Sequence, residues 1–380
     1  MNQVAIIGAG PAGLATAIRL KKEGFDSIVL EEHPSIGAPE NCSGLISKKG
    51  VDDLGLDVSE CLMNKIRGAK IYAPNGEMIK VTRNSTVAYL TNREKFDLML
   101  LKKARELNIH VATNTKLIDV RKNTLFVQAG GRGEIRKAEI IVGADGVNST
   151  IRHLMDIETK KDNFVHTIQA TATGDFEKEY VSVYTGDFAK GFFAWVIPID
   201  EKKAKIGLGA NLGENVSKNF KDFVEQKLPG VKTYKTKSFL VPYSPPMRKV
   251  VKNNMMLVGD AAFQTKATTG GGIIFGMKAG NILASTIADH FKHKTPLTDY
   301  EKRLGKINRE LLMHWKIRKY ANSIEGEKAS ELFNKLKAKG IDQFLEEHGE
   351  MDEPSAFISK LAKSPKYWFM AKTLLDILRS

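Results

Sequence analysis

The chain has 380 residues, of which 42% are hydrophobic and 27% charged, a composition typical of a globular protein large enough for two domains. Only two cysteines occur, Cys42 and Cys61, which excludes a disulfide framework and a CxxC metal site, and we expect no metal. No stretch approaches the ~20 consecutive apolar residues of a membrane span. The net charge of +14 favours an anionic partner, unless it reflects only a lysine-rich surface.

The N-terminus carries a nucleotide-binding fingerprint. The apolar run QVAIIG predicts a buried parallel strand, and it is followed by GAGPAG, a helix pattern and a second strand that ends at Glu31. Gly8 permits a tight turn, Gly10 lets the backbone approach a pyrophosphate, and Gly13 lets helix and strand pack closely. Ala12 lies in the same turn, and Glu31 can accept a ribose hydroxyl. The fingerprint therefore predicts a dinucleotide, either NAD or FAD.

Two later stretches bear on the choice between NAD and FAD. In EIIVGADGVNSTIR, an apolar strand precedes Asp145 and Gly146, and in residues 253–284 a strand ending at Asp260 precedes a glycine-rich turn and a long helix. A helix that starts directly after glycines offers free N–H groups and the positive end of its dipole. That end would stabilise the anionic pyrimidine ring of a reduced flavin and raise its potential.

Together these motifs resemble those of the p-hydroxybenzoate-hydroxylase-type flavoproteins. The resemblance implies FAD as the cofactor, with Asp260 at its ribityl or ribose part and Arg93 of TNREKFD in contact with it. The implied fold is α/β with α+β insertions: a Rossmann-like FAD-binding domain, an antiparallel-sheet substrate domain and a helical C-terminal region. The expected cofactor-binding residues are Gly8, Gly10, Ala12, Gly13, Glu31, Cys42, Gly44, Arg93, Asp145, Gly146, Asp260, Gly271, Gly272 and Ile273.

The segments between the motifs predict the rest of the fold. RGAKIYAPNGEMIKVT has the pattern of a hairpin around Asn75 and Gly76. HTIQATATG, YVSVYTG, GFFAWVIPID and KAKIGLGANL read as strands, and VSKNFKDFVEQKL reads as a helix. The expected domains are residues 1–66, 83–164 and 246–296 for FAD binding, 67–82 and 165–245 for substrate binding, and 297–380 for the helical region.

The loop PENCSG narrows the resemblance to the geranylgeranyl reductase family, which has a Cys-x-Gly sequence in a loop near the flavin. Cys42 matches that cysteine. The family's aromatic stretch, Tyr/Phe-x-Trp-x-Phe-Pro, is matched by Phe193 and Trp195, with Ile197 where Phe is usual. A second departure is Ala267, where the family often has Pro before the glycines. The closest resemblance is to archaeal members that saturate the isoprenoid chains of ether lipids.

The reaction implied by this resemblance is hydride delivery from reduced flavin to an isolated C=C bond, with a proton added at the other carbon. Because such a bond is unactivated, positioning and a proton donor must both contribute. Cys42 is the candidate catalytic residue, as proton donor or flavin-tuning group, and its alternative is a small buried hydrophobe. Phe193 and Trp195 suit an apolar slot for a prenyl chain, and their alternative is ordinary sheet core.

Two other functions stay open from the sequence. An aromatic hydroxylase of the same fold would need oxygen and NADPH and gives Cys42 no role. A membrane- or nucleic-acid-binding module would use the basic surface and keep FAD structurally. We expect the reductase, acting as a monomer on an isoprenoid lipid, with no nucleic acid partner. Either NAD(P)H or ferredoxin would supply its electrons.

The last segment, residues 364–380, bears on localisation, which we expect to be cytoplasmic with peripheral attachment to an anionic membrane. Ser364 and Pro365 are typical of a helix start, and an apolar stripe with helical spacing follows them. Trp368 and Phe369 lie beside this stripe, where aromatic rings favour a membrane interface. The alternative is that the stripe packs on the protein itself.

Overall fold

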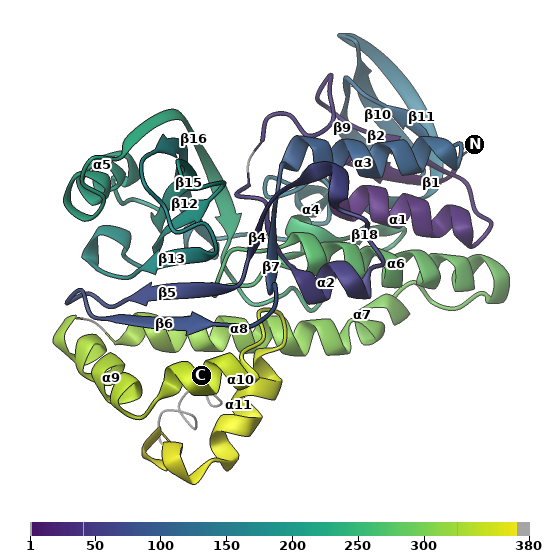
Figure 1. Cartoon of the computed structure of the whole chain (residues 1–380). Coiled ribbons are helices and arrows are strands. Elements are labelled where there is room, and N and C mark those ends of the chain that lie inside the picture. The colour runs from purple at the N-terminus through teal and green to yellow at the C-terminus, as the bar shows by residue number, and fades with distance from the viewer. Residues whose placement is uncertain (1, 41, 325, 371–380) are drawn as a thin grey trace.

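The computed structural model describes residues 2–40, 42–324 and 326–370 (Figure 1). Its first sheet has eight strands, in the order β17-β18-β11-β1-β2-β8, with β10 on β11 and β9 on β10. The strands are β1 (Asn2–Ile7), β2 (Ser27–Leu30), β8 (His110–Ala112), β9 (Thr115–Arg121), β10 (Thr124–Ala129), β11 (Arg132–Gly143), β17 (Val251–Lys252) and β18 (Met255–Leu257). Four helices belong to the same part of the fold: α1 (Pro11–Lys22), α3 (Arg93–Glu106), α4 (Thr150–Leu154) and α6 (Ile273–His293).

The fingerprint folds as its glycines predict. β1 pairs in parallel with β2 and β11, and α1 connects β1 to β2. Gly8 has a φ of +102°, and a Cβ there would lie 2.4 Å from the carbonyl oxygen of Ala144. A Cβ on Gly13 would lie 2.1 Å from the carbonyl oxygen of Gly8. Both glycines are therefore required for strand and helix to approach this closely.

The second sheet has seven strands, in the order β16-β12-β15-β14-β13-β5-β6. They are β5 (Gly68–Tyr72), β6 (Met78–Thr82), β12 (Phe164–Thr173), β13 (Tyr180–Tyr184), β14 (Ala194–Pro198), β15 (Lys203–Asn211) and β16 (Lys232–Pro242), with α5 (Val216–Lys227) packed on β12 and β15. The predicted hairpin is confirmed as β5 and β6. The predicted antiparallel sheet is antiparallel except at one pair, because β13 and β5 run in parallel where the hairpin joins the other strands. The domain boundaries remain a prediction.

Two shorter groups of elements join the sheets. A three-stranded sheet contains β3 (Leu45–Ser47), β7 (Ala88–Thr91) and β4 (Leu62–Ile66). Helix α2 (Lys48–Asp53) follows β3 directly in the chain. Single 3-10 turns are η1 (Ser59–Cys61), η2 (Lys161–Asn163), η3 (Asp187–Ala189) and η4 (Gly259–Ala262). The loop that contains Cys42 runs directly into β3, so this small sheet fixes the end of that loop.

The C-terminal region is helical as predicted, with α7 (Asp299–Arg303), α8 (Gly305–Ser323), α9 (Gly326–Ala338), α10 (Ile341–His348), α11 (Pro354–Lys363) and η5 (Pro365–Met370). In Figure 1, α8 passes below the β5–β6 hairpin, and α9 to α11 lie below α8. Helix α10 packs on β6, and the backbone N–H of Thr82 donates to Glu346 at 2.8 Å. The C-terminal helices are therefore attached to the second sheet.

The structure describes only the start of the predicted amphipathic segment. Residues 365–370 form a 3-10 turn rather than an α-helix, and residues 371–380 lie outside the described residues. Tyr367 is buried and donates its hydroxyl to the carbonyl oxygen of Gly340 at 2.9 Å, whereas Trp368 is 64% exposed. No helix within the described ranges has the length and apolar character to cross a bilayer.

Candidate active site

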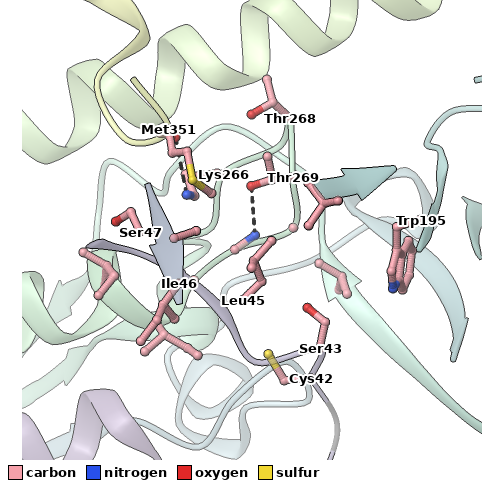
Figure 2. Close-up of a pocket in the computed structure, with 18 of the residues that line it drawn as sticks. Cys42, Ser43, Leu45, Ile46, Ser47, Trp195, Lys266, Thr268, Thr269 and Met351 are labelled. Carbon is pink, nitrogen blue, oxygen red and sulfur yellow. Dashed lines mark hydrogen bonds between the residues drawn. The ribbon is translucent and has the colours of Figure 1, made fainter. Parts of the chain in front are cut away.

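A cavity of about 660 Å³ lies where the two large sheets and the C-terminal helices meet. Figure 2 shows residues from distant segments around it: Cys42 and Ser43 from the loop before β3, Trp195 from β14, Lys266 and Thr268 from the loop before α6, and Met351 from the segment after α10. One continuous space is therefore lined by most of the predicted cofactor residues and by both predicted substrate residues.

One end of the cavity is lined by the turn after β1 and by the glycines after β11 and before α6. Its lining includes Gly10, Ala12, Gly146, Asp260, Gly271, Gly272 and Ile273. A Cβ on Gly10 or on Gly146 would meet no atom within 4 Å, so both glycines face open space. This end has the shape that a dinucleotide lying along the backbone requires.

Five predicted cofactor residues lie outside the cavity lining: Gly8, Gly13, Gly44, Glu31 and Asp145. Glu31 accepts a hydrogen bond from the N–H of Ala9 at 2.9 Å and pairs with His33 at 2.6 Å, so it supports the glycine turn. Asp145 accepts from the hydroxyl of Ser149 at 2.6 Å, and burial raises the pKa of its carboxyl group. Contact of either residue with a ligand stays a prediction.

Polar groups at this end face the cavity, and one of them lacks a partner. The carboxyl group of Asp260 lines the cavity, and burial raises its pKa against the lowering effect of the charges of Arg93 and Arg152. The Nε of Arg93 is buried and has no hydrogen-bond partner among the described residues. Helix α6 starts at Ile273, its N-cap residue Gly272 provides no side-chain cap, and the first residues of the helix line the cavity. Buried polar groups are normally hydrogen-bonded, so these groups fit a polar ligand such as FAD.

Cys42 lies in the cavity lining together with Arg93. The N–H of Gly44 donates to the Sγ of Cys42 at 3.4 Å, and Arg93 binds both carboxylate oxygens of Asp97, at 2.9 and 3.0 Å. Burial lowers the pKa of Arg93, but Asp97 and then Cys42 outweigh it and raise that pKa above its usual value. Cys61, in contrast, is 1% exposed in the core, and burial raises the pKa of its thiol. The two cysteines therefore have different environments.

The opposite wall is aromatic and apolar. Phe193, Trp195 and Ile197 line the cavity and are also buried in the sheet, and contact of Phe193 and Trp195 with a prenyl chain stays a prediction. The ring centroids of Phe193 and Trp195 are 5.8 Å apart, and the Nε1–H of Trp195 donates to the Oε1 of Gln169 at 3.3 Å. The wall suits an apolar chain, and its one polar indole group is already satisfied.

Sequence reasoning missed the residues that the C-terminal region brings to the cavity. Lys266 and Asp352 form a buried ion pair at 2.7 Å, and the hydroxyl of Ser47 donates to the other carboxylate oxygen of Asp352. Glu350 and Met351, which directly precede Asp352 in the chain, also line the cavity. No local pattern signals this cluster, because Ser47 and Lys266 are 305 and 86 residues away from Asp352 in the chain.

We expect Asp352→Asn to destabilise the protein by about 3–5 kcal/mol at pH 7, because Lys266 would keep its charge without a buried partner. Burial raises the pKa of Asp352, but Lys266 and Ser47 outweigh burial and hold this pKa below its usual value. The carboxylate therefore contributes stability above about pH 4, and loses that contribution as the pH falls through its folded-state pKa.

Urea denaturation at pH 7 and at pH 3 checks this prediction. The difference between wild type and Asp352→Asn should shrink at the lower pH. Asp222→Asn is the matched control, because Asp222 pairs with Lys218 on an exposed helix face, where a pair contributes only about 0.3–0.5 kcal/mol. An equal destabilisation by Asp352→Asn at both pH values would contradict the ion-pair account.

The fold and the cavity define a flavoprotein, and comparison with known proteins identifies its family. Residues 1–313 match the family described as FAD binding domain. A digeranylgeranylglycerophospholipid reductase of Methanosarcina acetivorans is 33% identical over 300 residues, which cover 73% of each chain. An uncharacterized protein of Methanocaldococcus jannaschii is 28% identical over 390 residues, covering 99% of this chain and 98% of that protein.

A solved structure has the same fold along nearly the whole chain. The crystal structure of a geranylgeranyl bacteriochlorophyll reductase-like protein of Thermoplasma acidophilum has a TM-score of 0.86 at 21% identity, and the match covers 99% of this chain and 98% of that one. The chain therefore belongs to the FAD binding domain family and, within it, to the geranylgeranyl reductase family. FAD is its cofactor, and the open glycines of the cavity and the unpartnered Nε of Arg93 fit it.

Proposed function

We propose that this protein is an FAD-dependent reductase that saturates C=C bonds in the geranylgeranyl chains of membrane ether phospholipids or their precursors. The observation that carries the proposal is one cavity in which the uncapped start of α6, the thiol of Cys42 and the apolar wall of Phe193 and Trp195 all take part. The named reductase of Methanosarcina acetivorans supports the substrate class. NAD(P)H or ferredoxin supplies the electrons.

The residues of this chain divide the work of such a reaction. When bound, FAD supplies the hydride. Phe193 and Trp195 hold the prenyl chain and exclude water from the C=C bond. Cys42 donates the proton to the second carbon, and the guanidinium of Arg93 stabilises the thiolate that remains until solvent restores the proton. Arg67 and Arg83 also line the cavity and suit the phosphate of a lipid headgroup.

An anaerobic single turnover tests this function. The enzyme is reduced with dithionite, freed of excess reductant and mixed with an ether lipid that carries unsaturated geranylgeranyl chains. The absorbance of oxidised flavin should return without oxygen. The fully saturated lipid with the same headgroup is the control and should leave the flavin reduced. Reoxidation that requires oxygen whichever lipid is present would contradict the proposal and favour the hydroxylase.

Peripheral attachment to an anionic membrane is the second part of the proposal, because a lipid substrate has to be reached in its bilayer. The exposed ring of Trp368 supports a contribution of the C-terminus. We expect a truncation after Tyr367 to weaken binding to anionic vesicles several-fold, since it removes Trp368 but keeps the buried Tyr367. Each Lys or Arg that the truncation removes would also take away about 1 kcal/mol of binding free energy to an anionic surface.

Co-sedimentation with vesicles of anionic and of neutral lipid at low salt measures this binding. Tyr234→Ser is the control, because Tyr234 is also an exposed aromatic residue but lies on β16. Equal binding of wild type and truncation would assign attachment to the basic surface alone. No binding of wild type to either kind of vesicle would contradict membrane attachment altogether.

A further inference from the structure

Arg318 is a buried arginine that joins the two walls of the cavity. It lies on α8, lines the cavity and is 9% exposed. Its Nε donates to the carbonyl oxygen of Ala267 at 3.2 Å, and its Nη2 donates to that of Thr268 at 2.7 Å. Its Nη1 donates to the carbonyl oxygen of Phe192 at 3.2 Å. The guanidinium therefore connects the loop before α6 to the aromatic wall.

The charge of Arg318 has no counter-ion in the described part of the chain. Its three acceptors are neutral carbonyl groups, and no carboxylate lies within 4.0 Å of it. Burial lowers the pKa of Arg318 to about 10, which leaves it protonated at neutral pH. In contrast, Lys266 and Arg93 are paired with Asp352 and Asp97. A buried charge without a counter-ion is costly, so its retention calls for an anion that it can stabilise.

The other titratable groups around Arg318 do not neutralise it. His314 lies one turn earlier on α8, and burial followed by the charge of Lys266 lowers the pKa of His314 to about 3, so it is uncharged. Burial raises the pKa of Tyr243, whose hydroxyl accepts from the amide of Asn322 at 2.6 Å. Phe192 and Phe193 present their rings to the guanidinium at 5.1 and 5.2 Å. The positive charge is therefore not cancelled by its surroundings.

The loop that Arg318 holds leads directly to the uncapped start of α6. The N–H of Gly270 donates to the carbonyl oxygen of Lys266 at 2.7 Å, and the N–H of Lys266 donates to that of Gly271 at 3.0 Å. These bonds close the loop into a compact turn, and Gly272 and Ile273 follow in the cavity lining. Arg318 therefore holds the backbone that, a few residues later, presents the positive end of the α6 dipole to the cavity.

We propose that Arg318 is an electrostatic positioning residue, whose fixed charge behind the loop favours the anionic reduced flavin over the neutral oxidised flavin. This inference rests on the proposed function, because it assumes that FAD cycles between these two states in the cavity. Stabilising the reduced flavin favours the step in which the electron donor reduces the cofactor. The charge raises the reduction potential, and the three hydrogen bonds hold the charge in place.

Arg318→Gln removes the charge and keeps a polar side chain. We expect it to shift the equilibrium between oxidised and reduced flavin about tenfold toward the oxidised form, or about 30 mV for a two-electron couple. Arg318→Lys keeps the charge and should stay within threefold of wild type. Arg309→Gln is the matched control, since Arg309 lies exposed on the same helix, and it should also stay within threefold.

The midpoint potential of each holoenzyme, measured by equilibration with a reference dye, is the readout, together with the affinity of the apoprotein for oxidised FAD. A purely structural role would weaken binding of both flavin states equally, and an unchanged potential in Arg318→Gln would overturn the proposal. If this variant does not fold, Asn322→Asp places a carboxylate one turn from Arg318 and leaves the arginine in place. Its potential should fall in the same direction, and no fall would again overturn the proposal.

This test is independent of lipid turnover. A lowered potential in an enzyme that never reduces a lipid would leave the role of Arg318 standing and reject the substrate. Lipid reduction by wild type together with an unchanged potential in Arg318→Gln would support the substrate and reject the role of Arg318.

Discussion

Cys42→Ala should lower the rate of lipid reduction at least ~100-fold and leave the bound FAD in place, because a positioned proton donor contributes about 10²–10⁴-fold. Cys42 lies in the cavity lining next to Arg93, and the N–H of Gly44 fixes its sulfur. Alanine keeps the volume of the loop nearly unchanged. The loss should therefore appear in the rate at saturating lipid rather than in stability or in cofactor content.

Cys61→Ala is the matched control for this prediction. Cys61 is buried in the core, away from the cavity lining, and its thiol donates to the carbonyl oxygen of Val58 at 3.3 Å. This variant should lose some stability and keep its rate. If Cys42→Ala reduces lipid at the rate of wild type, Cys42 only packs the loop, and the proton comes from another group.

Gly10→Val should abolish FAD binding without unfolding the protein. Gly10 has a φ of −73°, which any residue adopts, and a Cβ at this position would meet no protein atom within 4 Å. The valine side chain would therefore point into open space, where we expect the cofactor to lie. We expect at least ~100-fold weaker binding of FAD, since the backbone could no longer approach the pyrophosphate.

The ratio of flavin absorbance to protein, together with the melting temperature, measures this effect. Gly133→Val is the control: Gly133 also faces open space, but it lies exposed on β11, so FAD content should be normal. Gly13→Val should instead prevent folding, because its Cβ would lie 2.1 Å from the carbonyl oxygen of Gly8. Wild-type FAD content in Gly10→Val would show that the cofactor does not lie along this turn.

The parts of the fold that depend on neighbouring residues were predictable from the sequence. The β1–α1–β2 unit, the hairpin at Gly76 and the long helix α6 each have a local signal in apolar spacing and glycine position. Strand β16 was missed, because its first half carries a lysine at every second or third position and is exposed at a sheet edge. Such an edge strand has no apolar alternation to reveal it.

Parts of the site that depend on contacts distant in sequence were not predictable. The cofactor end follows from local glycines, whereas Arg318 reaches Phe192 across more than a hundred residues of chain. The ion pair of Lys266 and Asp352 also joins residues that are far apart in the sequence. A single sequence shows each of these charges only as one more basic or acidic residue, and its burial becomes visible only when α8 and α10 are placed against the sheets.

Mass spectrometry of the lipid product tests the central claim most directly. Dithionite-reduced enzyme is incubated without oxygen with an ether phospholipid whose geranylgeranyl chains are unsaturated, and the Cys42→Ala variant is treated in parallel. The account predicts that wild type adds pairs of hydrogen atoms to the chains and that the variant adds almost none. A lipid of unchanged mass with wild type, or a product that gains oxygen when air and NADPH are supplied, would contradict it.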